Sequence, residues 1–186
     1  IRVTSSGQGE PSPLLLDTRA LILLLGGVEE EVAQSARKVA EEAQAAGGLR
    51  LCDVSLFELA QLEERGELIF SIPLLSWVEQ ALDTPGLSLE RLTPEIAAEA
   101  ARLPGGQTMG PGVGTGAGTG PGAGDRDAGV GAAAGRQEGG NPGAGLSMID
   151  RIVAATARVQ RLPLLAGSRS LASYGNAGYL SIVPLR

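Results

Sequence analysis

The stretch that decides the fold is LLLDTRALILLL, residues 14–25, in which three leucines run directly into an acid before apolar residues resume. A carboxylate in so apolar a segment is expensive to desolvate unless it is paired or binds something. Asp17 therefore needs a partner, and Arg19, two residues later, is the nearest candidate. Asp17 is also a residue type that caps helices well, so the segment has a purely structural interpretation too.

Segments that favour strands alternate with segments that favour helices along most of the chain. Strands are predicted at 14–17, 51–54, 87–92, 163–166 and 179–184. Helices are predicted at 20–25 with Thr18 as cap, 28–46 with acids in its first turn, 55–65, 73–82, 94–103 after Thr93, 147–160 and 168–174. This alternation predicts one α/β domain with a mainly parallel sheet over 13–186.

Two segments lack the composition of a packed domain. Residues 1–12 are polar and rich in turn formers, so they predict a flexible N-terminal arm. Residues 104–146 hold well over half of the 28 glycines and almost no large apolar side chains. Such a segment cannot bury enough surface to offset its ordering entropy, so it predicts a disordered insertion.

Composition excludes several kinds of chemistry. The chain has no histidine, which removes His-based triads and His metal ligands, and its single cysteine, Cys52, excludes an internal disulfide. A formal net charge of −6 disfavours broad, non-specific nucleic-acid binding. The apolar run 14–25 carries two charges and is too short to span a membrane. We therefore expect a cytoplasmic protein with no membrane partner.

Three acids from distant parts of the chain are predicted to meet at one edge of the sheet. Asp17 follows the first strand, Glu58 lies one turn into the helix after the second, and Asp150 lies in the first turn of helix 147–160. In a parallel sheet the functional edge is where strands end and helices begin. Carboxylate oxygens suit Mg²⁺ or Mn²⁺, which can activate water and steady the charge of a phosphodiester.

Each of these acids also has an ordinary explanation. Ser55 and Glu58 match a capping box, and Ser147 and Asp150 resemble the same pattern. From spacing alone capping is favoured over catalysis for Glu58 and Asp150. Asp53 is interpreted as a loop or strand-end residue.

Three residues outside the acid set have ordinary interpretations too. Trp77 favours packing over RNA stacking. Arg151 and Arg158 favour solvated helix faces over phosphate contacts.

Four blocks of the sequence, taken in order, resemble one known family. LLLDTRAL resembles the LLDTHAL opening of PIN-domain ribonucleases of the VapC toxin type, and CDVSLFELAQLEERGEL resembles their SAISLWEIA-LVERGRL segment. PLLSWVEQALDTPGLSLERLTPEIAAEAARLPG follows the same family, and MIDRIVAATARVQRLPLLAGSRSLASYG is similar to its PADRLIAATA…LPLLTADRRLLAYG ending. The resemblance covers about 13–103 and 147–185.

The resemblance implies a PIN-like three-layer α/β/α sandwich and a metal-dependent endoribonuclease that cleaves single-stranded RNA. Asp17, Glu58 and Asp150 match the acids that hold Mg²⁺ or Mn²⁺ in that family, with Thr18 and Ser168 as supporting residues. A VapB-type antitoxin and a homodimer are the implied protein partners.

The chain departs from the family pattern at four places. Arg19 replaces a common histidine, Ser147 and Ser168 stand where the family often has aspartates, and 104–146 replaces a short connection. Two alternatives therefore stand beside the ribonuclease. One is a degenerate PIN domain that binds antitoxin or RNA without cleavage, and the other is a structural α/β domain whose acids are caps.

Overall fold

A computed structural model describes residues 13–26, 32–103 and 146–185. Within these residues the chain forms seven helices and five strands, and all four strand pairings are parallel. The order across the sheet is β3-β2-β1-β4-β5. The strands are β1 (Leu14–Leu16), β2 (Leu49–Cys52), β3 (Leu87–Glu90), β4 (Leu164–Ala166) and β5 (Ile182–Pro184). The helices are α1 (Thr18–Leu25), α2 (Gln34–Ala45), α3 (Val54–Glu64), α4 (Leu74–Leu82), α5 (Pro94–Arg102), α6 (Met148–Gln160) and α7 (Arg169–Asn176). The predicted α/β class is confirmed.

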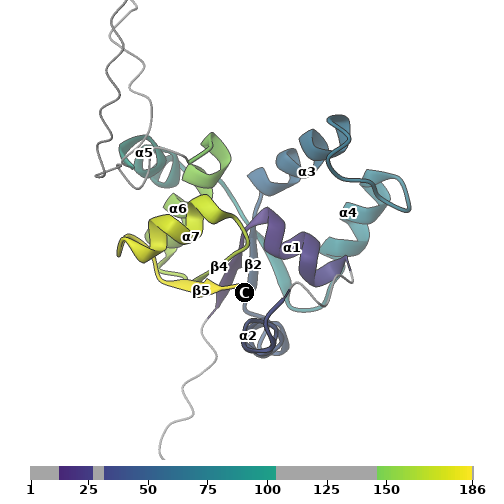
Figure 1. Cartoon of the computed structure of the whole chain (residues 1–186), viewed down its shortest axis with the longest axis horizontal. Coiled ribbons are helices and arrows are strands. Elements are labelled where there is room, and N and C mark those ends of the chain that lie inside the picture. The colour runs from purple at the N-terminus through teal and green to yellow at the C-terminus, as the bar shows by residue number, and fades with distance from the viewer. Residues whose placement is uncertain (1–12, 27–31, 104–145, 186) are drawn as a thin grey trace, which may run out of the picture.

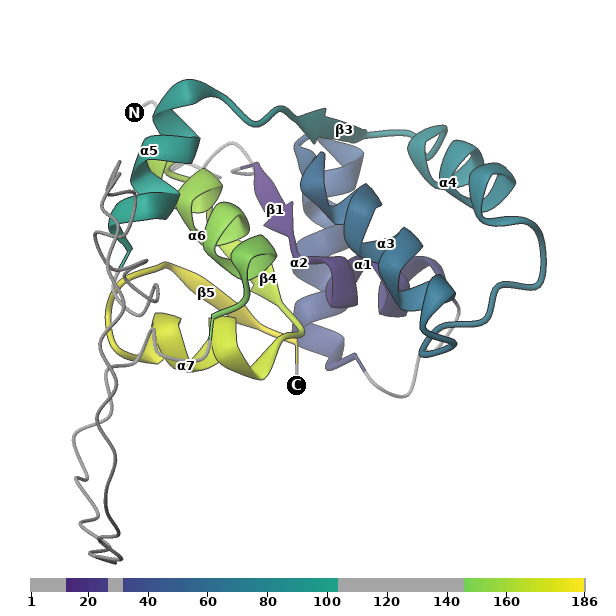
Figure 2. The same cartoon turned by 90° about the horizontal axis from the view of Figure 1, so that it is seen from above.

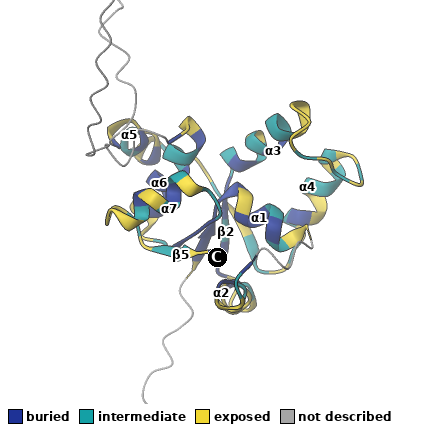
Figure 3. Ribbon diagram, in the orientation of Figure 1, coloured by how far each residue is buried: buried dark blue, intermediate teal, exposed yellow. Residues whose placement is uncertain are grey.

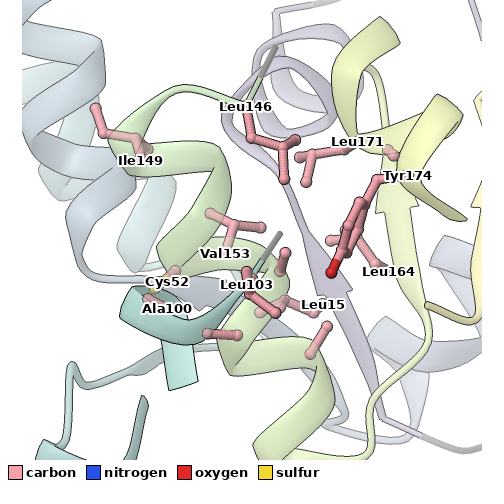
Figure 4. Close-up of a cluster of buried hydrophobic side chains, with 14 of the residues drawn as sticks. Leu15, Cys52, Ala100, Leu103, Leu146, Ile149, Val153, Leu164, Leu171 and Tyr174 are labelled. Atoms are coloured by element: carbon pink, nitrogen blue, oxygen red, sulfur yellow. The ribbon is translucent and has the colours of Figure 1, made fainter. Parts of the chain in front are cut away.

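Side chains of the central strands alternate between two cores, one on each face of the sheet. In β1, Leu15 belongs to one buried cluster, whereas Leu14 and Leu16 belong to the other. The Leu15 cluster packs against α5, α6 and α7, and Figure 4 shows it closing around Val153 and Tyr174. The other cluster packs against α1 to α4. Figures 1 and 2 show these two groups of helices on opposite sides of the sheet, which gives three α/β/α layers.

The central strands are short and fully enclosed. All three residues of β1 and all three of β4 are buried, and Figure 3 shows this dark centre between partly exposed helices. A parallel sheet covered on both faces favours continuous apolar strands, as in LLL and LLA. The edge strand β3, by contrast, has no fully buried residue. The leucines that flank Asp17 in sequence are therefore the middle of the core.

Several predicted boundaries need correction. Strand β2 spans Leu49–Cys52 rather than 51–54, because it pairs in register with β1 through Leu49 and Leu51. Strand β5 begins at Ile182 rather than 179. Apart from the start of helix 28–46, the other predicted boundaries differ from the structure by one or two residues, which is the usual uncertainty of a helix or strand end.

Of the two caps considered for α1, the structure selects Asp17 over Thr18, because the Asp17 carboxylate accepts the Ala20 N–H. Helix α3 begins at Val54 after Asp53 and has no side-chain cap, so the predicted Ser55–Glu58 capping box is wrong. Ser55 is instead fully buried. The helical part of predicted helix 28–46 that the structure describes begins at Gln34, and none of its first-turn residues is acidic.

Two predictions fall on segments that the structure does not describe. The flexible arm at 1–12 and the disordered insertion at 104–146 lie outside the described residues, except for Leu146. Leu146 packs in the Leu15 cluster. Residues 28–31, the start of predicted helix 28–46, also lie outside the described residues.

The packing of Trp77 is confirmed. It lies against the α1 to α4 core, with its ring centroid 5.0 Å from that of Phe70. Arg158 is exposed, as predicted, although its side chain reaches α5, whereas the solvated face predicted for Arg151 is wrong because this side chain is half-buried against α5. Arg151 donates to the Ala100 carbonyl at 2.6 Å, and Arg158 pairs with Glu99 at 2.8 Å.

Among the described residues, no helix combines the length and the apolar character that crossing a membrane requires.

Candidate functional site

A cleft of about 820 Å³ opens at the carboxyl ends of β1 and β4. The chain leaves β1 toward β2 on one side of the sheet, whereas β4 and β5 lie on the other side. The gap between β1 and β4 is therefore the point at which the strand order reverses. Ligands of open parallel sheets bind outside the carboxyl ends of strands at such a point. The topology alone marks this cleft as the candidate site.

All five residues predicted for the site line this one cleft. Asp17 and Thr18 come from the β1–α1 junction, Glu58 from α3, Asp150 from α6 and Ser168 from the β4–α7 junction. Helices α3 and α6 contact each other across the edge of the sheet. The fold thus brings together three carboxylates that are far apart in the sequence.

Asp17 is the most constrained of the three acids. Its side chain is only 3% exposed, and both of its carboxylate oxygens accept backbone hydrogen bonds. Oδ1 accepts from Ala20 at 2.6 Å, and Oδ2 accepts from Gly167 and Ser168 at 2.8 Å each. Burial raises the pKa of Asp17 to about 6 against the lowering effect of these three N–H groups, and the charge of Asp150 adds to the rise.

Glu58 is half-buried on the α3 side of the cleft. Burial raises its pKa, a weak polar contact with the Thr18 hydroxyl lowers it, and the charge of Asp150 raises it again. Because Glu58 is not part of a capping box, its position at the cleft has no capping explanation.

Asp150 combines a structural contact with a place in the cleft. Its carboxylate accepts the Ser147 N–H at 3.3 Å, and its own N–H donates to the Ser147 hydroxyl at 3.0 Å, so the predicted capping box at this position is confirmed. Burial raises the pKa of Asp150, whereas the Ser147 groups and the Ser168 hydroxyl lower it. Its negative charge raises the pKa values of both Asp17 and Glu58.

Arg19 is not the partner of Asp17 that the sequence suggested. The carboxylate of Asp17 is bound by the three backbone amides, and the side chain of Arg19 is exposed at the cleft. The Arg19 Cβ and Cγ atoms lie close to Gly167. The aspartate in the apolar run is therefore compensated by the backbone and not by a neighbouring charge.

Sequence reasoning missed three residues of the cleft. Glu67 follows the left-handed Gly66 turn that ends α3, and Arg169 is the first residue of α7. Both line the cleft, and their places next to a Gly turn and a helix start were the available signals. Gly167 contributes through its backbone N–H, and a backbone donor leaves no signature in a sequence.

The ligand atoms of the cleft suit a divalent cation, but the spacing of its acids suits direct binding only in part. Hard carboxylate oxygens suit Mg²⁺ or Mn²⁺, and the charge of Asp150, which raises the pKa values of Asp17 and Glu58, favours a nearby positive charge. Over the described ranges, however, no three acidic or cysteine side chains lie close enough together to ligate one ion directly. The arrangement fits a hydrated ion, because Mg²⁺ usually keeps several waters and binds only one or two carboxylates.

Comparison with known proteins adds no family assignment. No family model matches the chain, and no curated protein matches it either. The PIN-domain family of the VapC type therefore stays a prediction that rests on the four sequence blocks.

Proposed function

We propose that the protein is a metal-dependent endoribonuclease of the PIN type that cleaves single-stranded RNA, as the toxin of a toxin–antitoxin pair. The observation that carries the proposal is the convergence of Asp17, Glu58 and Asp150 in one open cleft at the strand-order reversal. Each of these acids has a raised pKa. A cleft of this kind is a functional-site candidate on physical grounds.

The proposal gives the residues of the cleft two roles. Asp17, Glu58 and Asp150 would hold a hydrated Mg²⁺ or Mn²⁺, in part through its waters, and the ion would supply Lewis-acid stabilisation of charge on a phosphodiester. Arg19 and Arg169, which line the cleft, suit the phosphates of the RNA.

The partners of the proposed toxin are part of the same proposal. A VapB-type antitoxin would block the cleft, and two copies of the chain would form a homodimer in the cytoplasm. The two protein partners rest on the sequence resemblance, and the cytoplasmic location rests on the cysteine content.

A matched pair of variants on α3 tests the enzyme. Glu58→Gln removes a cleft carboxylate, whereas Glu64→Gln removes an exposed carboxylate of the same helix that does not line the cleft. With single-stranded RNA and Mn²⁺, Glu58→Gln is expected to cut about 100-fold more slowly or worse, and Glu64→Gln at the wild-type rate. Cleavage by the wild type that survives in Glu58→Gln and Asp17→Asn would refute the assignment of the site.

Binding without cleavage is the second candidate, and the acids of the cleft favour it. Over the described ranges no three acidic side chains lie close enough together to ligate one ion directly. Serines also stand at 147 and 168, where the resemblance would place acids. Tight RNA or antitoxin binding by a wild-type protein that never cuts, measured by fluorescence anisotropy beside the cleavage assay, would establish this alternative.

A further inference from the structure

The loop between β4 and α7 makes a specific contact with the first acid of the cleft. Two consecutive backbone N–H groups, those of Gly167 and Ser168, donate to the same oxygen of Asp17 at 2.8 Å each. Their partner is 150 residues away in sequence and 3% exposed. Such charge-assisted bonds are about twice as strong as neutral ones, so they fix the orientation of the carboxylate.

Gly167 is required for this approach because of its size. A Cβ atom at position 167 would lie 2.9 Å from the Cβ and Cγ atoms of Arg19 and 3.1 Å from Cδ2 of Leu185. Those Arg19 atoms are next to its backbone and cannot swing away as the end of a long side chain can. Any larger residue would push the loop away from α1, and with it the two donors of Asp17.

We propose that Gly167 and Ser168 are positioning residues of the cation site, acting through their backbone N–H groups as a clamp on Asp17. The clamp uses both acceptor positions of Oδ2, while Ala20 uses one on Oδ1. Asp17 then offers a cation a single position, on Oδ1, in a fixed direction. This inference rests on the proposed metal-dependent function and specifies how the first acid would bind its ion.

A pair of substitutions at one position isolates the N–H group. Ser168→Ala removes the hydroxyl and keeps the N–H, whereas Ser168→Pro removes both. Ser168 has φ of −73°, which proline adopts without strain, and the proline Cδ would stand where the N–H points at Asp17. Any loss that depends on the hydroxyl, including its contact with Asp150, is common to both variants.

Mn²⁺ binding to the purified full chain, followed by electron paramagnetic resonance of free Mn²⁺, is the first measurement. Loss of an outer partner of a metal ligand typically weakens metal binding 10–100-fold. Ser168→Pro is expected to bind Mn²⁺ about 10–100-fold more weakly than Ser168→Ala. Equal affinity in the two folded variants would overturn the clamp while leaving the proposed function intact. A wild type that binds no Mn²⁺ would instead overturn the proposed function, and the positioning role with it.

Gly167→Ala gives a second comparison, with Gly48→Ala as its control. A Cβ at position 48 is similarly crowded, 3.1 Å from the Pro13 Cα, but Gly48 precedes β2 at the opposite edge of the sheet from the cleft. Only Gly167→Ala is expected to weaken Mn²⁺ binding. Equal weakening by both variants would reduce Gly167 to a packing role and overturn its assignment.

Amide resonances test the contact itself without any metal. Hydrogen bonds to a carboxylate move an N–H proton downfield, so the Gly167 and Ser168 resonances are expected to shift upfield in Asp17→Asn. The Gly48 resonance serves as the reference, since its N–H donates to the Ala43 carbonyl far from the cleft. Unmoved Gly167 and Ser168 resonances would refute the clamp.

Discussion

Burial of Asp17 makes the stability of the folded protein depend on pH in an unusual direction. Its pKa is raised from 3.8 to about 6, so between these values the folded state binds more protons than the unfolded state. Stability therefore falls as pH rises through this window. The contribution of Asp17 to the free energy of unfolding is fully present below about pH 4 and is lost above about pH 6. Since one pKa unit corresponds to 1.36 kcal/mol, the loss from Asp17 is about 3 kcal/mol.

Asp17→Asn removes this titration and is the variant that measures it. Urea unfolding of wild type and variant, at a series of pH values between about 3.5 and 7.5, gives the difference in their free energies of unfolding. That difference is expected to change by about 3 kcal/mol across the window, because the free energy of unfolding of the wild type falls relative to that of the variant as pH rises. Glu58 and Asp150 also have raised pKa values, but both proteins carry them, so to first order they cancel.

The matched control is Asp53→Asn. Asp53 also follows a strand and also accepts a backbone hydrogen bond, from Leu92, but it does not line the cleft. A difference between wild type and Asp17→Asn that stays constant with pH would refute the claim that burial outweighs the three N–H donors of Asp17.

Three further predictions concern the fold that carries the site. Leu165→Ala in the centre of β4 is expected to lower the free energy of unfolding by about 2–5 kcal/mol, measured by urea unfolding, because the side chain is fully buried. Gly86→Ala is expected to lower it by more than about 1 kcal/mol, since position 86 has φ of +84° and its Cβ would meet the Gln44 carbonyl; a wild-type melting temperature would contradict this. Arg158→Ala, which breaks a partly exposed pair with Glu99, is expected to cost only about 0.2–1 kcal/mol in the same unfolding assay, and a larger loss would mean that the pair is more buried in solution.

The sequence predicted the parallel α/β fold because its signals there are strong and local. Apolar LLL and LLA segments, each bounded by polar residues, mark buried strands without any knowledge of the rest of the chain. The placement of Asp17 at the functional edge followed from its position directly after β1. Boundaries were less accurate where pairing decides them: Leu49 joins β2 because it lies opposite Leu14, and no local pattern states that register.

The side chains that line the candidate site could be predicted from the sequence, whereas the backbone N–H groups that bind Asp17 could not. The spacing of Ser55 and Glu58 predicted a capping box. In the structure Ser55 is buried in the core, and the helix starts one residue earlier, at Val54. Asp17 and Thr18 were both credible caps, and only the bond to the Ala20 N–H decides between them. The donors at Gly167 and Ser168 meet Asp17 through tertiary structure, so sequence reasoning turned to Arg19 instead.

The electrostatics of Asp17 connect the stability of the fold to the proposed activity. Three N–H donors lower the pKa of this carboxylate, yet burial still holds it near 6. The ionised form that is needed for cation binding therefore stays destabilised at neutral pH, and Asp150 adds to that destabilisation. A divalent cation in the cleft would relieve both effects, so the same burial that weakens the apo fold above about pH 6 strengthens the preference of the cleft for positive charge. Sites often give up stability in this way, because a group that function needs in its charged form is buried where that form is unfavourable.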